Sequence, residues 1–276
     1  MEALLSIRIR YSRGDEAKYI SHLDLMRTFE RALRRTDIAV AYTGGFNPRM
    51  KLVFGLPLPV GMTSEAEYAD IDTDEEINPE DFLEKLNSQL PSGLKVLEAA
   101  VKKDSRNIMA SIAAAQYEIT ISVGNVKTVR EIHDAIMGFI SQDKILAEKE
   151  SKNRTAIVDI KPLILNVSLY AGTENTYKLR DIGNNSAGDN CGKNKGQEHG
   201  ENNSGLSENL TGGIKLNVTV RAGNTENLKP DLLINALSQW SGINMKVLKI
   251  HRVNLYIAGE KGELISPMHS SVVLRR

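Results

Sequence analysis

The order of strand-like and helix-like stretches in the first hundred residues most constrains the fold. In Leu4–Tyr11 apolar and polar residues alternate, which is the period of a half-buried strand. The successive predicted elements are a strand at 4–11, a helix at 22–35, strands at 50–58 and 65–72, a helix from 78 to 90, and a strand at 94–101. This order is that of the ferredoxin-like split βαβ plan.

A similar series follows in the second half of the chain. The predicted elements there are strands at 116–123, 145–150, 155–160, 163–170 and 213–221, helices at 126–141 and 228–239, and a closing strand after 242. Aligning Pro79 with Pro230 matches the apolar positions of the two last helices, which indicates an internal repeat. The alternative is that two amphipathic helices match by chance.

We therefore expect an α+β fold of two ferredoxin-like modules in tandem. The first module is expected at residues 1–101 and the second at 116–258, joined by a linking helix over 102–115 and followed by a tail over 259–276. Residues 171–212 are rich in Asn, Gly and Ser and have few large apolar groups. Because such a segment cannot offset its ordering entropy by burial, we predict a disordered insertion in the second module.

The charges of this chain are balanced overall but unevenly distributed. Lys plus Arg and Asp plus Glu both number 35, so the net charge makes no case for nucleic acid. Residues 1–60 hold ten basic and six acidic side chains, whereas residues 61–100 hold two and eleven. A basic segment thus precedes an acidic one.

Composition also limits the cofactors and the location. The single cysteine, Cys191, excludes an internal disulfide and any cysteine-ligated zinc or iron–sulfur site within this chain, and we expect no metal and no cofactor. No apolar run approaches the roughly 20 residues that span a bilayer. The first residues lack the pattern of a signal peptide, so we expect a cytoplasmic protein that does not bind membranes.

The segment from Tyr42 to Lys51 differs most from ordinary scaffold. The Gly44-Gly45 pair permits backbone conformations that are closed to other residues, and Asn47-Pro48 favours a turn. Arg49 and Lys51 add positive charge beside exposed amides, a combination that indicates an anion-binding loop. The alternative is a loop that only connects a helix to a strand.

The preceding helix carries a second possible site. Ser21, with Asp24 three residues later, is placed to cap its amino end. One face is apolar and the other is basic, which is consistent with either a binding surface or a solvated face. The basic residues are Arg27, Arg31, Arg34 and Arg35. His22 lies on the apolar side, where it is either a partly buried structural residue or an acid or base.

We expect the helix start and the loop to meet at one end of the first module. The candidate catalytic residue is His22. The candidate substrate- or anion-binding residues are Tyr19, Ser21, His22, Arg27, Arg31, Gly44, Gly45, Asn47, Arg49 and Lys51.

Several segments resemble the radical SAM-linked protein family, a bacterial family of unknown function. They are Tyr19–Arg27, Arg31–Arg35, Gly45–Pro48, Pro57–Gly61, Asp159–Pro162, Asn227–Leu233 and Arg252–Tyr256. The family commonly has glutamine in place of Gly44 and often histidine in place of Arg49. The resemblance implies a radical SAM protein as partner, often encoded near an RNase E/G type ribonuclease. This chain lacks the CxxxCxxC motif, so that partner is a separate chain.

Three functions remain open from the sequence. The first is a non-catalytic companion that docks to a radical SAM enzyme and helps to hold an anionic substrate such as RNA. The second is an RNA-processing or RNA-modifying enzyme that uses His22 as acid or base. The third is a structural interaction domain whose acidic segment binds a basic partner. The low aromatic content, 5%, argues against a strong general RNA binder, because bases stack on aromatic side chains.

Overall fold

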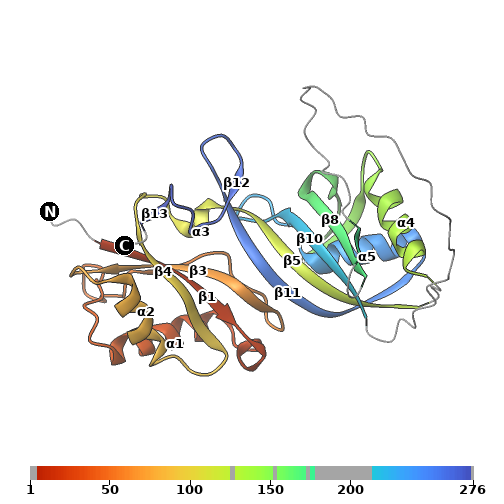
Figure 1. The fold of residues 1–276 in the computed structure, drawn as a ribbon. Helices are drawn as coiled ribbons and strands as arrows, with labels where there is room; N and C mark the ends of the chain where they lie inside the picture. Colours follow the sequence, from red (N-terminus) through yellow and green to blue (C-terminus); the bar gives the residue numbers. More distant parts are fainter. Residues whose placement is uncertain (1–4, 125–127, 152–153, 172–174, 178–212, 275–276) are drawn as a thin grey trace, which may run out of the picture.

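The computed structural model describes residues 5–124, 128–151, 154–171, 175–177 and 213–274. Figure 1 shows a mixed α+β fold in which one large, curled sheet runs through the molecule and the longer helices lie toward its two ends. Within the described residues this sheet has eleven strands, in the order β13-β4-β1-β3-β11-β5-β10-β8-β9, with β2 paired to β3 and β12 to β11.

The elements largely follow the predicted pattern. The strands are β1 (Leu5–Arg13), β2 (Leu52–Phe54), β3 (Thr63–Thr73), β4 (Leu94–Lys102), β5 (Ile112–Gly124), β6 (Leu146–Ser151), β7 (Arg154–Asp159), β8 (Ile164–Ala171), β9 (Asn175–Tyr177), β10 (Ile214–Arg221), β11 (Asn244–Ala258), β12 (Leu264–Ile265) and β13 (Val273–Leu274). The helices are α1 (His22–Arg35), α2 (Pro79–Asn87), α3 (Ile108–Ser111), α4 (Val129–Ile140) and α5 (Pro230–Ser241).

Residues 5–102, which we call the first half, place β4, β1, β3 and β2 side by side in that order. Every neighbouring pair is antiparallel. Helices α1 and α2 pack against this part of the sheet (Figure 1), and their apolar faces bury Phe29 and Phe82 in a core with Ile7 and Ile9 of β1. The strand alternation and the amphipathic helices predicted from the sequence therefore produce this core.

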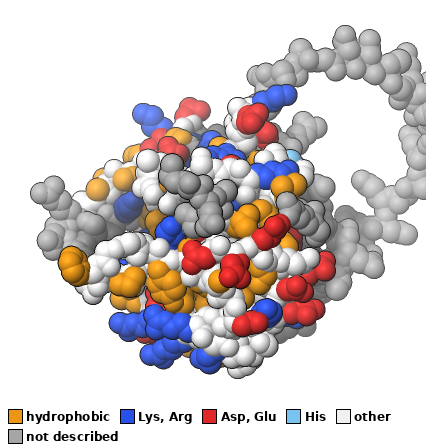
Figure 2. Space-filling model, turned by 90° about the vertical axis from the view of Figure 1, so that its left-hand side faces the viewer, with side chains coloured by type: hydrophobic (Ala, Val, Ile, Leu, Met, Phe, Trp, Pro, Cys, Tyr) orange, Lys and Arg blue, Asp and Glu red, His pale blue; other side chains and the backbone are white. Residues whose placement is uncertain are grey.

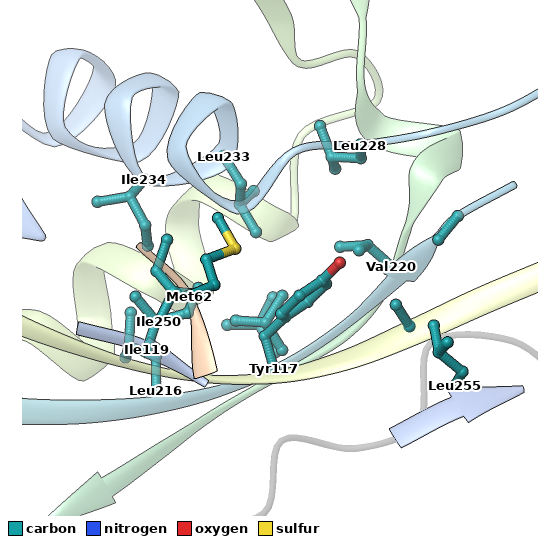
Figure 3. Packing of buried hydrophobic residues seen from close by; sticks show 14 of the residues in the cluster. Met62, Tyr117, Ile119, Leu216, Val220, Leu228, Leu233, Ile234, Ile250 and Leu255 are labelled. Carbon is teal, nitrogen blue, oxygen red and sulfur yellow. The ribbon is translucent and has the colours of Figure 1, made fainter. Parts of the chain in front are cut away.

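Residues 112–258, the second half, have the strand order β11-β5-β10-β8, again antiparallel throughout. Helices α4 and α5 cover this part of the sheet. Ile136 of α4 and Leu233 and Ile234 of α5 are buried against it. Figure 3 shows side chains of α5 meeting those of the strands in this core.

The two halves join through β3 and β11, which pair in parallel where His251 meets Thr63 and Arg252 meets Ser64. Met62 of the first half is buried beside Tyr117 in the core of the second (Figure 3). The structure thus supports a coarser description than the two ferredoxin-like modules that the sequence predicts, namely an α+β fold with one large, curled sheet and few helices.

The linking helix predicted over residues 102–115 is absent from the structure except for the single turn of α3. Its start is capped by Asn107, whose side-chain oxygen accepts hydrogen bonds from the amides of Met109 and Ala110. Ala114 and Ala115, which suggested a helix, lie fully buried in β5 between β10 and β11. Pairing on both sides overrides their helix propensity.

Residues 259–274, which the sequence sets apart as a tail, return to the first half. Strand β12 pairs with β11, and β13 pairs with β4. Met268, Val272 and Val273 are buried. This segment is therefore part of the packed structure.

The predicted hairpin is present as β6 and β7, a separate two-stranded sheet. Of the predicted disordered insertion at 171–212, residues 172–174 and 178–212 lie outside the described residues. β9 is described and pairs with β8. The aligned helices α2 and α5 both begin at a proline, and each leads into a strand beside the first strand of its half.

Candidate functional site

The amino end of α1 is capped as the sequence predicts. The Ser21 hydroxyl oxygen accepts a hydrogen bond from the Asp24 amide at 3.1 Å. The same hydroxyl donates to the Asp24 carboxylate at 2.7 Å. A carboxylate in the first turn already interacts favourably with the positive end of the helix dipole. The helix terminus is thus stabilised by the protein itself, and any external anion at this end must be held mainly by cationic side chains.

The outer face of α1 is basic. Arg27 contacts Asp24 at 3.4 Å, and Arg35 donates to the backbone and side-chain oxygens of Gln89. Arg31 and Arg34 are exposed and have no hydrogen bond or ion pair to any residue that the structure describes. Figure 2 views the molecule from the end that carries the first half and shows Lys and Arg side chains gathered along its lower edge, at the height of α1 in Figure 1.

The glycine loop lies between two short segments, at Ala41 and at Lys51, which both pair with β3. The Ala41 amide donates to Asp72, and the Asp72 amide donates to Lys51, so residues on both sides of the loop pair with the same residue of β3. A hydrogen bond from the Lys51 amide to the Ala41 carbonyl closes the base of the loop. Residues 42–49 are exposed above that base. The loop is therefore a projection from the sheet edge, anchored at both ends.

Two further bonds order the lower part of this loop. The Thr43 amide donates to the Arg49 carbonyl at 2.8 Å, and the Arg49 amide donates to the Thr43 hydroxyl oxygen at 3.0 Å. Gly45 has a φ angle of +105°, a backbone conformation that residues other than glycine rarely adopt. Gly44 has no such constraint, and a Cβ at either position would meet nothing within 4 Å. The glycine that the loop conformation requires is thus Gly45.

His22 packs beside the strand that follows the loop. Its ring lies 5.8 Å from that of Phe54 in an edge-to-face arrangement. Burial lowers the pKa of His22, and the charge of Arg13 lowers it further. The imidazole is therefore neutral at pH 7 and is suited to accept a proton or a hydrogen bond rather than to attract an anion. Asp24, the carboxylate two residues after it, is bonded to Ser21 and Arg27.

Arg13, which the sequence analysis did not single out, holds the turn before α1 in place. Its side chain is 1% exposed. It donates to the carbonyl oxygens of Ala17, Lys18, Ile20 and Leu58. One buried guanidinium thus connects the turn that precedes α1 with the segment after β2 and fixes the position of Tyr19.

Arg252 plays a similar role from the second half. It pairs with buried Glu67 at 2.9 Å and 3.1 Å and donates to the carbonyls of Leu56 and Pro57 and to the Tyr117 hydroxyl. Burial is the largest single influence on the pKa of Arg252 and lowers it, but the charges of Glu67 and Tyr117 and the hydrogen bonds to both together outweigh it, and the net shift is upward. Burial raises the pKa of Glu67, and Arg252 opposes that rise. The two side chains join the halves beneath the 56–61 segment.

The predicted site residues fall into two groups. Tyr19, Ser21 and His22 lie together at the start of α1, with Arg27 and Arg31 farther along the helix. The second group is the loop from Gly44 to Lys51. Phe54, which contacts His22, follows Lys51 by three residues, about 10 Å along a strand. The predicted meeting of the two groups at one end of the first half is not seen. The Lys18 carbonyl, next to Tyr19, accepts a hydrogen bond from the Gly61 amide near the Thr63 end of β3, whereas the base of the loop bonds to Asp72 near the other end of that strand.

The comparison with protein families bears on this site. A model of the family described as "uncharacterized protein conserved in bacteria" (DUF2344) matches residues 6–230. The chain belongs to this bacterial family of unknown function. No curated protein matches the sequence.

The region matched to DUF2344 contains both groups of site residues together with Arg13 and Glu67. It ends at the first residue of α5, so Arg252 lies beyond it. In the described part of this DUF2344 protein, no helix is long and apolar enough to cross a membrane.

Proposed function

We propose that this protein is a non-catalytic companion of a radical SAM enzyme and holds an anionic substrate, RNA, on its first half. The observation that carries the proposal is the exposed basic face of α1, where Arg31 and Arg34 are free to bind, next to a projecting loop with Arg49. Clustered arginines beside exposed amides suit phosphate groups.

The balanced total charge is compatible with this proposal. Screening limits the reach of exposed charges to about 10 Å at 0.1 M salt, so binding depends on local clusters rather than on the net charge. The acidic segment that follows is separate in sequence from the basic one and offers no phosphate contacts. We therefore assign the RNA backbone to α1 and the loop.

The environment of His22 favours binding over catalysis. A general base is usually oriented by a third group. The described residues provide no hydrogen-bond partner for the His22 ring, and Asp24 is occupied by Ser21 and Arg27. If His22 nevertheless transferred a proton, His22→Ala would lower the rate on the order of a hundredfold. We expect instead that His22→Ala leaves RNA affinity unchanged and lowers only local stability.

The radical SAM partner rests on the resemblance of the motifs, and this sequence itself contains no CxxxCxxC motif. We also propose that the halves are related ferredoxin-like modules, since each has the same antiparallel plan, β4-β1-β3-β2 and β11-β5-β10-β8. Sedimentation of this chain with the radical SAM protein of the same genome tests the partnership. Independent sedimentation at micromolar concentrations would contradict it.

The RNA assignment is tested by removing charge from α1. Arg31→Ala/Arg34→Ala should weaken binding of a labelled single-stranded RNA about tenfold at low salt and reduce the slope of log affinity against log salt by about 1. Arg130→Ala/Lys144→Ala, which removes two exposed charges from the second half, is the matched control. Equal affinities for both double variants across a salt titration would refute the proposed surface.

A further inference from the structure

Exposed aromatic side chains concentrate at the candidate site. Among residues whose side chains are described, four aromatic residues are exposed: Tyr19 (71%), Tyr42 (42%), Phe46 (106%) and Trp240 (46%). The first three belong to the start of α1 and the glycine loop. The low aromatic content of the chain therefore does not weaken the case for RNA, because three of the four exposed rings belong to the candidate site residues or their loop.

Phe46 has no structural role in the folded protein. Its side chain is fully exposed at the tip of the loop, where burial contributes nothing to stability. Full burial of a phenylalanine contributes roughly 1.5–3 kcal/mol, which this position forgoes. The loop beneath it is nevertheless anchored by the bonds of Thr43 and Lys51. An ordered base thus presents an apolar ring to the solvent.

Tyr19 is also held in place while its ring remains open. The carbonyl of Lys18 accepts bonds from Arg13 and from the Gly61 amide at 2.7 Å, so the backbone beside Tyr19 is fixed from two directions. The Lys18 ammonium lies 5.3 Å from the centre of the Tyr19 ring. The same ammonium pairs with Asp15 at 3.0 Å, so what this position offers to a ligand is the exposed Tyr19 ring rather than the Lys18 charge.

Tyr42 lies at the foot of the loop, where it pairs with Met50. Met50 and Phe54 are four residues apart, about 13 Å along a strand, and the Phe54 and His22 rings lie a further 5.8 Å apart. Single-strand-binding folds contact roughly 4–16 nucleotides, and a strand of about 12 nucleotides at about 3.4 Å per nucleotide spans about 41 Å, which exceeds the sum of those two distances. One strand of RNA can thus reach both groups of aromatic residues.

We infer that the ligand is single-stranded RNA whose unpaired bases stack on Tyr19, Tyr42 and Phe46 while Arg49 and Lys51 contact its phosphates. The inference rests on the proposed function and specifies its substrate class. Every base has a π-face, so such a surface binds without strong sequence preference. In a duplex the base faces are stacked on each other and are inaccessible to these rings.

The test uses the full chain and three probes: a labelled mixed-sequence RNA of about 12 nucleotides, the same RNA annealed to its complement, and inorganic polyphosphate. Phe46→Ala and Tyr19→Ala should each weaken single-strand binding about tenfold, since a stacked base contributes roughly 1–3 kcal/mol. Polyphosphate binding should not change, and the duplex should bind more weakly than the single strand.

Three variants serve as controls. Phe46→Trp should retain affinity, whereas Phe46→Leu, which keeps an apolar but non-aromatic side chain, should not. Trp240→Ala removes the exposed ring of the second half and should have no effect on RNA. Phe46 is fully exposed, so its variants should keep the wild-type thermal unfolding temperature. Trp240→Ala also removes the contact of that ring with Phe139, so its folded state is checked by circular dichroism at the temperature of the binding assay.

The outcomes separate the two proposals. If RNA and polyphosphate bind equally and Phe46→Ala changes neither, the stacking inference fails while the anion-binding function stands. If neither probe binds the wild-type protein, the proposed function itself fails. If Phe46→Ala leaves RNA binding intact but abolishes association with the radical SAM protein, the ring belongs to a protein interface and the inference is overturned.

Discussion

The junction between the halves and the outer face of α1 use arginine in opposite ways. At the junction Arg13 and Arg252 are each 1% exposed. They donate to backbone carbonyls of the segment that follows β2, which lies outside the sheet. On α1, Arg31 and Arg34 are exposed to solvent. A buried guanidinium satisfies several acceptors at once, whereas an exposed one provides charge. The number of basic residues in a segment therefore indicates a function only after burial is known.

The largest effect on stability is expected from replacing a buried arginine. Arg252→Met leaves Glu67 buried without its cation, which should lower the free energy of unfolding by about 3–5 kcal/mol. Denaturant unfolding measures the change. Arg31→Met, the exposed counterpart, should stay within about 0.5 kcal/mol of wild type.

A double variant separates the ion pair from packing. Glu67→Leu together with Arg252→Met should recover part of the loss, because no uncompensated charge remains. If Arg252→Met were as stable as Arg31→Met, the buried pair would not hold the halves together.

A smaller effect is expected in the loop. Gly45→Ala forces an alanine into a φ angle of +105° and should lower the free energy of local opening of the loop by about 1 kcal/mol. Gly44→Ala has open space and no such constraint and should be neutral. Hydrogen exchange at the Arg49 amide, which bonds to Thr43, reports the local opening. Similar exchange in both variants would show that the conformation of Gly45 does not order the loop.

Acid should weaken the fold through two half-buried histidines, His251 at the junction and His22 beside Phe54. Burial lowers the pKa values of both His22 and His251, so the unfolded chain binds protons more readily than the folded one. Their contribution is complete above the ordinary pKa of about 6.5 and is lost as pH falls through it toward the folded values. Unfolding measured from pH 8 to pH 5 should show this decline, and His22→Asn/His251→Asn should flatten it. An unchanged slope would exclude these groups.

The smallest effect on stability is expected from replacing the basic residues of the loop. Arg49→Ala/Lys51→Ala should leave the free energy of unfolding within about 0.5 kcal/mol, since it removes exposed charge rather than packing. It should nevertheless weaken RNA binding in a salt-dependent manner. Loss of stability without loss of binding would reverse the assignment of the loop to the ligand.

The local structure of the site was predictable from the sequence. The helix from His22 to Arg35 and its Ser21 cap agree with the structure, because amphipathic period and capping depend on residues within a few positions of one another. The loop was also recognisable from its glycines, although only the structure distinguishes Gly45 from Gly44. The buried arginines were not predictable as such, since an arginine in a strand pattern is equally consistent with solvent.

The sequence by itself determined the order and type of nearly all described elements, the apolar faces of the helices and the basic face of α1. Tertiary structure alone decided that β3 pairs with β11, that Ala114 and Ala115 belong to a strand, and that residues 259–274 pack on the first half. The tertiary structure also decided which aromatic rings remain exposed to solvent. The physical reason is range: period, caps and turns are set by neighbours in the chain, whereas strand pairing and burial are set by residues distant in sequence.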